Sequence, residues 1–308
     1  MARTRGHEAD RPTPAGGLMR LEGTGFGEAF RRRQPVEFGH ALADHPLLSL
    51  EAIADLADSL PRDSIIYDTA DQALLVPEGG PPRGALDRPG DVIRHLGENR
   101  SWLTLLNVEQ HPAYAKLMDD CLDEVEPHVA VRGMDMRRRV GFVFVSSPNS
   151  TTPAHFDIEH SLIMQMHGQK RLTFGRFETP EARRHEVVRY WDGSHGRIEA
   201  LPPELVRFDL VRGMGVYIPP VTPHWVRNGD AVSVSVTLTF FTPDTDRESL
   251  VQAFNARLRR VRLSPRWPGE SPLADQAKVT AMRAYALRRR LPRRLPGRRR
   301  SGKGAPTT

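Results

Sequence analysis

Apolar and polar residues alternate along short stretches in the middle of the chain. The segment 232–240, Val-Ser-Val-Ser-Val-Thr-Leu-Thr-Phe, alternates without a break, and 140–146 is a short run rich in Val and Phe. A period of two predicts a strand with two different faces. Further strands are predicted at 64–68, 101–107, 152–157, 161–166, 170–177, 206–218 and 225–241. Short strands separated by turn signals favour an all-β sandwich or barrel.

Helical spacing of apolar residues flanks this β-rich segment on both sides. Ser49 is the expected N-cap of a helix that Pro61 ends, and Pro112 is expected to open another helix. Helices are predicted over 50–60, 91–96, from 112, over 246–263 and over 273–291. The Pro- and Gly-rich stretch 77–90 is predicted to be a loop, and the charged stretch 180–201 an irregular insertion over the barrel mouth.

We therefore expect a mainly β protein with helical additions, divided into five segments. These are a disordered N-terminus (1–20), an N-terminal α/β extension packing on the barrel (21–138), the β core (139–243), a C-terminal helical region (244–291) and a basic disordered tail (292–308). A chain of 308 residues can bury a sizeable core.

The composition indicates in which compartment the protein is expected. The single Cys121 allows no internal disulfide, which is typical of a reducing compartment, so a cytoplasmic location is expected. The first 17 residues lack an apolar segment, which gives no indication of a secretory signal, and no apolar run is long enough to span a membrane.

The net charge of +6 is unevenly distributed. From Arg283 onward there are nine Arg, one Lys and no acidic residue, so residues 1–282 carry 6 − 10 = −4. A run of basic charge is usually a solvated tail, although binding of nucleic acid or another polyanion stays open as an alternative.

One pair of side chains indicates metal chemistry. If 152–157 is a strand, His155 and Asp157 point the same way because they stand two residues apart. His224 follows the apolar segment Tyr217-Ile-Pro-Pro and a Pro-braced turn, and it can supply a third ligand. Two His and one carboxylate on one face of a metal are typical of non-haem Fe(II) oxygenases. Each His taken alone is more often a core or surface residue, and His160, His167, His185 and His195 lack a matching pattern.

The predicted strand at 170–177 begins with an uncommon residue for this chain. Lys170 follows Gly168 and Gln169, and only four Lys stand against 40 Arg. Arg171, the next residue, is expected to point to the opposite face.

Three motifs together resemble a known family. The sequences Thr152-Pro-Ala-His155-Phe-Asp157, Gly168-Gln-Lys170-Arg171 and Tyr217-Ile-Pro-Pro with His224 are similar in order and spacing to the JmjC and cupin-like oxygenases that depend on Fe(II) and 2-oxoglutarate, closest to the branch of factor-inhibiting-HIF-type hydroxylases. The resemblance covers about 139–242 and implies a double-stranded β-helix, or jelly-roll, core.

The resemblance also implies a site and a reaction. Fe(II) would be held by His155, Asp157 and His224, and Lys170, with help from Thr152, would bind the distal carboxylate of 2-oxoglutarate. Thr239 matches a cofactor-contacting position where the family usually has an amide, and for a further contact Thr104 and Asn107 are only candidates. O₂ would be the co-substrate, and succinate and CO₂ would be released as a peptide or protein side chain, or a small metabolite, is hydroxylated; demethylation is the less favoured variant. Related enzymes dimerise through C-terminal helices, so a homodimer is possible.

Two questions stay open at this level. The polar face at 233, 235, 237 and 239 can lie in water, or it can line the cofactor cavity as the resemblance implies; we favour the cavity. The chain can also be a non-enzymatic cupin-like binding or regulatory protein that acts through its basic tail, but such a protein has no physical need for a complete ligand triad together with Lys170.

Overall fold

The protein is described from a computed structural model, which describes residues 17–69, 73–75, 86–129 and 135–290. The chain divides into two compact units, and the boundary along the sequence lies between Ser249 and Leu250. The predicted disorder of 1–16 and of the tail from 291, and most of the loop predicted at 77–90, lie outside the described residues. Met19 and Arg20, which the sequence placed in the disordered terminus, form the short strand β1 instead (Met19–Arg20).

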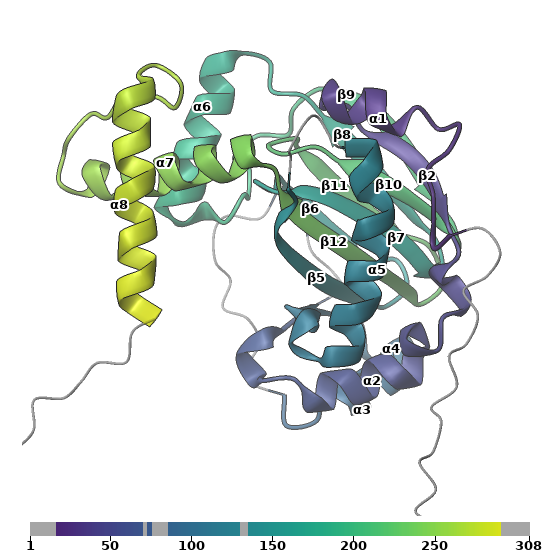
Figure 1. The fold of residues 1–308 in the computed structure, drawn as a ribbon. Helices are drawn as coiled ribbons and strands as arrows, with labels where there is room; N and C mark the ends of the chain where they lie inside the picture. The colour runs from purple at the N-terminus through teal and green to yellow at the C-terminus, as the bar shows by residue number, and fades with distance from the viewer. Residues whose placement is uncertain (1–16, 70–72, 76–85, 130–134, 291–308) are drawn as a thin grey trace, which may run out of the picture. The chain divides into compact units, whose positions relative to one another are not determined.

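Eight antiparallel strands form the core of the first unit (Figure 1). They are β5 (Arg137–Ser146), β6 (Thr151–His155), β7 (His160–His167), β8 (Lys170–Gly175), β9 (Glu204–Leu210), β10 (Met214–Ile218), β11 (His224–Asn228) and β12 (Ser233–Phe241). Strands β10, β7, β12 and β5 are neighbours in one sheet, and β6, β11, β8 and β9 form the other. Apart from β8 and β9, which pair within the small sheet, successive strands therefore switch between two facing sheets. This is the jelly-roll arrangement, and the predicted fold is confirmed.

The segment before the core extends the larger sheet at both edges. Strands β1 and β2 (Val36–His40) continue it beyond β10, and β4 (Ser101–Leu106) and β3 (Ile65–Thr69) continue it beyond β5, giving eight strands. The helices of this segment are α1 (Phe26–Arg31), α2 (Leu50–Ser59), α3 (Pro89–Arg94), α4 (Leu96–Asn99) and α5 (Pro112–Val129). As predicted, Ser49 caps α2, accepting a hydrogen bond from the amide of Ala52 at 3.2 Å.

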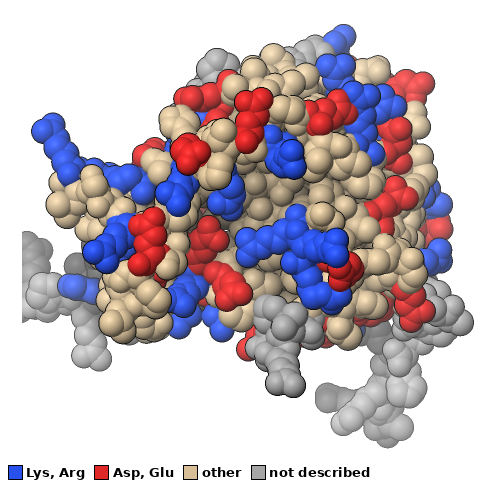
Figure 2. Space-filling model, turned by 90° about the horizontal axis from the view of Figure 1, so that it is seen from above, with Lys and Arg blue, Asp and Glu red and all other residues tan. Residues whose placement is uncertain are grey.

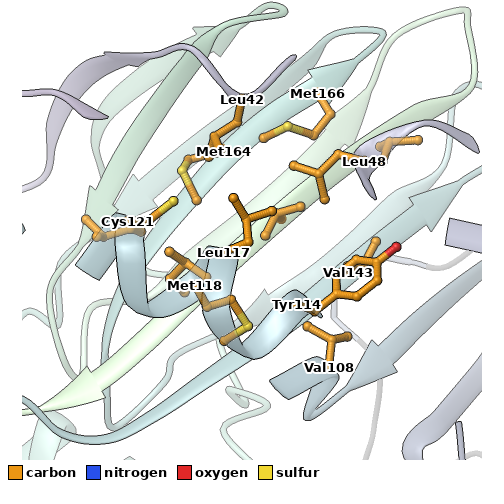
Figure 3. Close-up of a cluster of buried hydrophobic side chains, with 14 of the residues drawn as sticks. Leu42, Leu48, Val108, Tyr114, Leu117, Met118, Cys121, Val143, Met164 and Met166 are labelled. Atoms are coloured by element: carbon orange, nitrogen blue, oxygen red, sulfur yellow. The ribbon is translucent and has the colours of Figure 1, made fainter. Parts of the chain in front are cut away.

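Helix α5 covers one face of the large sheet, and a hydrophobic core lies between them. Figure 3 shows Met118 and Cys121 of α5 in the same cluster as Val143 of β5 and Met164 of β7. A Cβ at Gly141 would lie 2.3 Å from the Met118 side chain, so the glycine lets the helix approach the strand. Burial raises the pKa of the Cys121 thiol, which makes it an inert core residue.

The charged stretch 180–201 differs from the prediction. It contains the helix α6 (Pro180–Arg189), which Thr179 caps, followed by a π-helical turn at Tyr190–Ser194. The residues lack an apolar stripe, so periodicity could not reveal the helix. Local groups stabilise it: the Glu186 carboxylate lies 2.6 Å from the guanidinium of Arg189 and accepts the amide hydrogen of Glu199 at 2.9 Å.

Helix α7 (Pro243–Arg260) begins in the first unit and ends in the second, and α8 (Pro272–Arg290) belongs to the second. Within the second unit, Asn255 donates to the carbonyl oxygen of Arg266 at 3.0 Å and Asp275 accepts the amide hydrogen of Gly269 at 2.7 Å. These side-chain bonds fix the loop between the two helices. Among the described residues, no helix combines the length and the apolar character needed to cross a membrane.

Candidate metal centre and cavity

The pairing of β6 with β11 brings two histidines together. His155 ends β6 and His224 begins β11, and the two stand directly opposite each other with ring centroids 4.2 Å apart. Each Nδ1 lies within hydrogen-bond distance of a carbonyl oxygen two residues earlier, Pro153 at 2.8 Å and Thr222 at 3.0 Å. Because a carbonyl oxygen can only accept, both Nδ1 atoms carry the hydrogen, which leaves the Nε2 lone pairs free for a metal.

Asp157 reaches the same place by a different route from the one the sequence suggested. We expected strand alternation to align it with His155, but β6 ends at His155 and Asp157 lies in the loop that follows. Its carbonyl oxygen accepts the amide hydrogen of Val221 at 2.6 Å, which ties this loop to the turn before His224. Val221 has a φ of +56°, a strained conformation for a β-branched residue.

These three side chains have the donor set of an open metal site. One ligand atom from each of His155, Asp157 and His224 lies within 4.8 Å of the other two, and the His224 Nε2 is 3.7 Å from the Asp157 carboxylate. Burial and the neighbouring His224 lower the pKa of His155 to about 3, so its imidazole is neutral, the form that binds metal. Two imidazole nitrogens and one carboxylate fit Fe(II) and leave coordination positions for other ligands.

A cavity of about 340 Å³ lies between the two sheets and includes all three ligands in its wall. The small sheet contributes Thr152, Lys170 and Leu172 to the wall, and the large sheet contributes hydroxyl groups and an apolar wall. The hydroxyls are those of Thr104, Ser146, Ser161, Thr237 and Thr239, and the apolar residues of the large sheet are Ile66, Trp102, Leu106, Phe142, Phe144, Ile163 and Ile218. A cavity of this size holds a small molecule.

Lys170 lines this cavity as a buried cation. Its side chain is 6% exposed, and its Nζ donates to the Ser235 hydroxyl on β12 at 2.7 Å. Burial lowers the pKa of this lysine to about 7. No described carboxylate forms an ion pair with it, whereas Arg171, the next residue, lies outside and pairs with Asp209 at 2.7 Å. The predicted opposite orientation of the two residues is thus seen directly.

The polar face of β12 points into the space between the sheets, not into bulk water. Thr237 and Thr239 line the cavity, while Ser233 and Ser235 are completely buried beside it. The apolar face, with Val236 and Leu238, packs in the core under α5. The interpretation that placed the hydroxyls in water was therefore wrong, and a cavity that must stay open explains why this face carries small side chains.

The structure separates the remaining candidates. Thr104 lies in the cavity wall, but Asn107 is exposed at the end of β4 and lies outside the lining. His160 is buried, 2.9 Å from the Tyr217 hydroxyl, and His185 pairs with Glu199. His185 is a residue of α6, which lies outside the two sheets (Figure 1).

Three groups in the cavity were not identified from the sequence. Glu159 follows Asp157 by two residues, and burial together with the Asp157 charge raises its pKa to about 7. Tyr190 and Arg197 come from the stretch that looked irregular; burial raises the pKa of Tyr190 and lowers that of Arg197. The spacing from Asp157 was the only sequence signal for Glu159, and nothing in the pattern pointed to the other two.

A short strap, residues 195–198, positions Arg197 along the free edge of β6. Gly196 accepts the amide hydrogen of Phe156 at 3.0 Å, Ile198 donates to the carbonyl oxygen of Ala154 at 3.4 Å, and Arg197 pairs with His155 in an isolated β-bridge. Gly196 has a φ of +84°, and a Cβ there would lie 2.1 Å from the Phe156 carbonyl oxygen. Only glycine fits this contact.

Comparison with known proteins gives limited information. No protein-family model matches the sequence, and no curated protein matches it. An X-ray structure of Escherichia coli YcfD is similar over 85% of this chain and 67% of that one, with 17% identity and a TM-score of 0.48. A structure described as YcfD, a ribosomal oxygenase from the same organism, in complex with cobalt and 2-oxoglutarate is similar over 87% and 68%, with 17% identity and a TM-score of 0.47. The chain thus spans about two thirds of the length of these solved chains. Its own strand order is that of a jelly roll.

Proposed function

We propose that this protein is an Fe(II)- and 2-oxoglutarate-dependent oxygenase. The observation that carries the proposal is one cavity that holds both an open triad of metal-type ligands, His155, Asp157 and His224, and a buried lysine, Lys170, without a described acidic partner. A buried ammonium without a counter-ion is costly unless an anion joins it. A 2-oxo dicarboxylate has the required chemistry: one end chelates a metal and the other carries a negative charge.

The residues of the chain have distinct tasks in this proposal. His155, Asp157 and His224 would hold the metal, and the two carbonyl contacts keep both imidazoles in the metal-binding tautomer. Lys170 neutralises the distal carboxylate of the 2-oxo acid. When bound, iron and 2-oxoglutarate supply the oxidising chemistry, with O₂ consumed, succinate and CO₂ released and one C–H bond of the substrate hydroxylated.

Thr152 and Thr239 are proposed to help hold the 2-oxo acid. Both hydroxyls lie in the cavity wall, and Thr239 also lies within 3.4 Å of the carbonyl oxygen of Val140. Hydroxyl donors add directional hydrogen bonds to the charge of Lys170. Glu159, Tyr190 and Arg197 also line the cavity, but they have no role in holding the metal or the distal carboxylate. We therefore propose that these three residues contact the substrate that is oxidised. The substrate is proposed to be a peptide or protein side chain, or a small metabolite.

Two wider proposals concern the setting. A cytoplasmic location is favoured by the single cysteine, which lies buried in the core. A homodimer through the second unit is favoured by its exposed apolar side chains, since Leu273 and Leu287 are 87% and 65% exposed. Sedimentation of the protein and of a Leu273→Arg, Leu287→Arg variant tests this: a shift of the wild type alone to twice the mass supports the dimer, and a monomeric wild type contradicts it.

The non-enzymatic alternative is less well supported by the described residues. On the face drawn in Figure 2, acidic and basic side chains are intermixed. Among the described residues, several arginines also have acidic partners, such as Arg94, which lies near four carboxylates. The basic residues of the tail from 291 lie outside the described part of the chain.

The proposed activity can be tested by measuring succinate. Purified protein is incubated with Fe(II), 2-oxoglutarate and O₂, alone and with a panel of peptides and metabolites. Succinate above the blank in the wild type, and its loss in the His224→Ala variant, are expected. Equal succinate formation by wild type and variant would show that His224 does not hold the metal. If the wild type forms no succinate with any substrate of the panel, the proposed activity is contradicted.

A further inference from the structure

The lysine pocket contains a second residue that neither the sequence motifs nor the metal site explains. Ser235 lies in the middle of β12, is completely buried, and accepts the hydrogen bond from Lys170 at 2.7 Å. Lys170 belongs to the small sheet and Ser235 to the large one, so this contact crosses the space between the sheets. The bond thus joins a lysine of the cavity wall to a serine that is not part of that wall.

In the described part of the chain, Ser235 is the one side-chain partner of the Lys170 ammonium. Among the described residues, no carboxylate lies within ion-pair distance of its Nζ, and Ser235 accepts its one described hydrogen bond. A lysine side chain has four rotatable bonds and about 2 kcal/mol of rotamer entropy. A single fixed acceptor therefore decides where the ammonium points, and its two other N–H groups remain for an anion.

Ser235 contacts the lysine but does not line the cavity itself. The wall of the cavity includes Lys170, Thr237 and Thr239, but Ser235 is absent from it. A direct contact of Ser235 with a bound 2-oxo acid is therefore not required by the geometry. The hydroxyl can anchor the ammonium, and it stabilises the charged form because its oxygen lone pair accepts from the ammonium.

We infer that Ser235 is a positioning residue for 2-oxoglutarate, acting through Lys170: it fixes and stabilises the ammonium that binds the distal carboxylate. This inference rests on the proposed function. It differs from a purely structural role, in which the bond only ties the two sheets together. A structural tie affects stability whether or not the 2-oxo acid is bound, whereas a positioning residue affects the affinity for the 2-oxo acid and its pH dependence.

Other charges do not take the place of Ser235. The remaining ionisable groups in the cavity wall are those of His155, Asp157, Glu159, Tyr190, Arg197 and His224. Burial alone accounts for the lowered pKa of Lys170, with no contribution from any of these groups. Arg171 of β8 and Asp209 of the neighbouring β9 pair with each other and are exposed. The hydroxyl is thus the described group in contact with the ammonium.

The chain supplies a matched control on the same strand. Ser233 stands two residues earlier on the same face, is 1% exposed, and accepts a hydrogen bond from the Gln165 side chain at 2.9 Å. No described hydrogen bond joins it to Lys170. Ser233→Ala therefore removes a buried hydroxyl from the same strand, with a similar effect on packing, but leaves the lysine untouched.

The experiment is calorimetric titration of 2-oxoglutarate into Fe(II)-loaded protein without oxygen, for wild type, Ser235→Ala and Ser233→Ala, between pH 6 and pH 9. Thermal unfolding of each iron-free protein is measured alongside. We expect Ser235→Ala to weaken binding about tenfold, the scale of one hydrogen bond to a charged group. Its affinity should also begin to fall at a lower pH than in the wild type, because the ammonium has lost its acceptor. Ser233→Ala should match the wild type in both respects.

The outcomes are distinguishable. If the wild type does not bind 2-oxoglutarate, the proposed function fails and the inference with it. If the wild type binds and Ser235→Ala binds equally well with the same pH profile, the inference alone is overturned. The same holds if Ser235→Ala and Ser233→Ala weaken binding equally, or if Ser235→Ala lowers only the unfolding temperature, because either result is that of a structural tie.

Discussion

At the scale of single residues, two neighbours with the same charge have opposite environments. Lys170 is buried in the cavity wall, and Arg171 is exposed and paired with Asp209. Strand alternation predicts this difference in direction from the sequence alone. It does not predict that Ser235 accepts from the lysine, because that contact depends on how two sheets face each other.

Lys170→Met is expected to weaken 2-oxoglutarate binding about thirtyfold to thousandfold, because a carboxylate that is buried without its cation loses roughly 2–4 kcal/mol. Lys170→Arg is not expected to restore binding, since the planar guanidinium is wider than an ammonium and Lys170 is buried. Titration of 2-oxoglutarate into the iron-loaded variants measures both effects. Iron content should be unchanged, and near-equal affinities for all three proteins would contradict the role given to Lys170.

The affinity for 2-oxoglutarate is expected to fall as the pH rises above about 7. Burial lowers the pKa of Lys170 to about 7, so in the free protein the amine is charged below this pH and neutral above it. Because the carboxylate binds the charged form, binding above pH 7 takes up a proton and weakens by up to about tenfold per pH unit. Lys170→Met serves as the control: the slope should vanish in it, and a slope that persists points to another group, such as Glu159.

At the scale of elements, the strap 195–198 contributes Arg197 to the wall of the cavity. The strap carries Arg197 beside His155, and the turn before it carries Tyr190. No periodic pattern marks these residues, so the sequence could only suggest an insertion over the barrel. Gly196 allows the strap to lie against Phe156, and this one contact makes the element testable.

Gly196→Ala is expected to lower the free energy of unfolding by at least about 1–3 kcal/mol, because the new Cβ meets the Phe156 carbonyl oxygen and φ is positive. Gly193→Ala is the control: its φ is also positive, at +125°, but no atom lies within 4 Å of the new Cβ. Chemical denaturation of both variants gives the comparison. A smaller loss for Gly196→Ala than for Gly193→Ala would contradict the described packing of the strap.

At the scale of the whole molecule, the sequence predicted the core better than its additions. Alternation and turn signals located most strands of the jelly roll, and the order of the His155, Lys170 and His224 motifs placed the site between them. Alternation could not show that β1 to β4 extend the large sheet on both edges, since edge pairing is set by long-range contacts. Alternation also gave the wrong reason for the position of Asp157. This residue lies in a loop after β6, and the loop is held by the hydrogen bond from Val221 to the Asp157 carbonyl oxygen.

Removal of residues 292–308 is expected to leave succinate formation with a small substrate unchanged. The described residues that line the cavity lie between Ile66 and Thr239, and none of them belongs to the removed segment. Five Arg and one Lys are lost with it, so any binding to a polyanion such as heparin should weaken and lose much of its salt dependence. A large fall in turnover by the truncated protein would show that the tail contributes to the active site.

The central claim is that His155, Asp157 and His224 hold an iron that 2-oxoglutarate chelates in the same cavity. The most direct measurement is the visible absorption of the protein with Fe(II) and 2-oxoglutarate in the absence of oxygen, together with its iron content. We predict a weak charge-transfer band and one tightly bound iron in the wild type, and the loss of both in folded His155→Ala and Asp157→Ala. Full iron occupancy and an unchanged band in either variant would contradict the account.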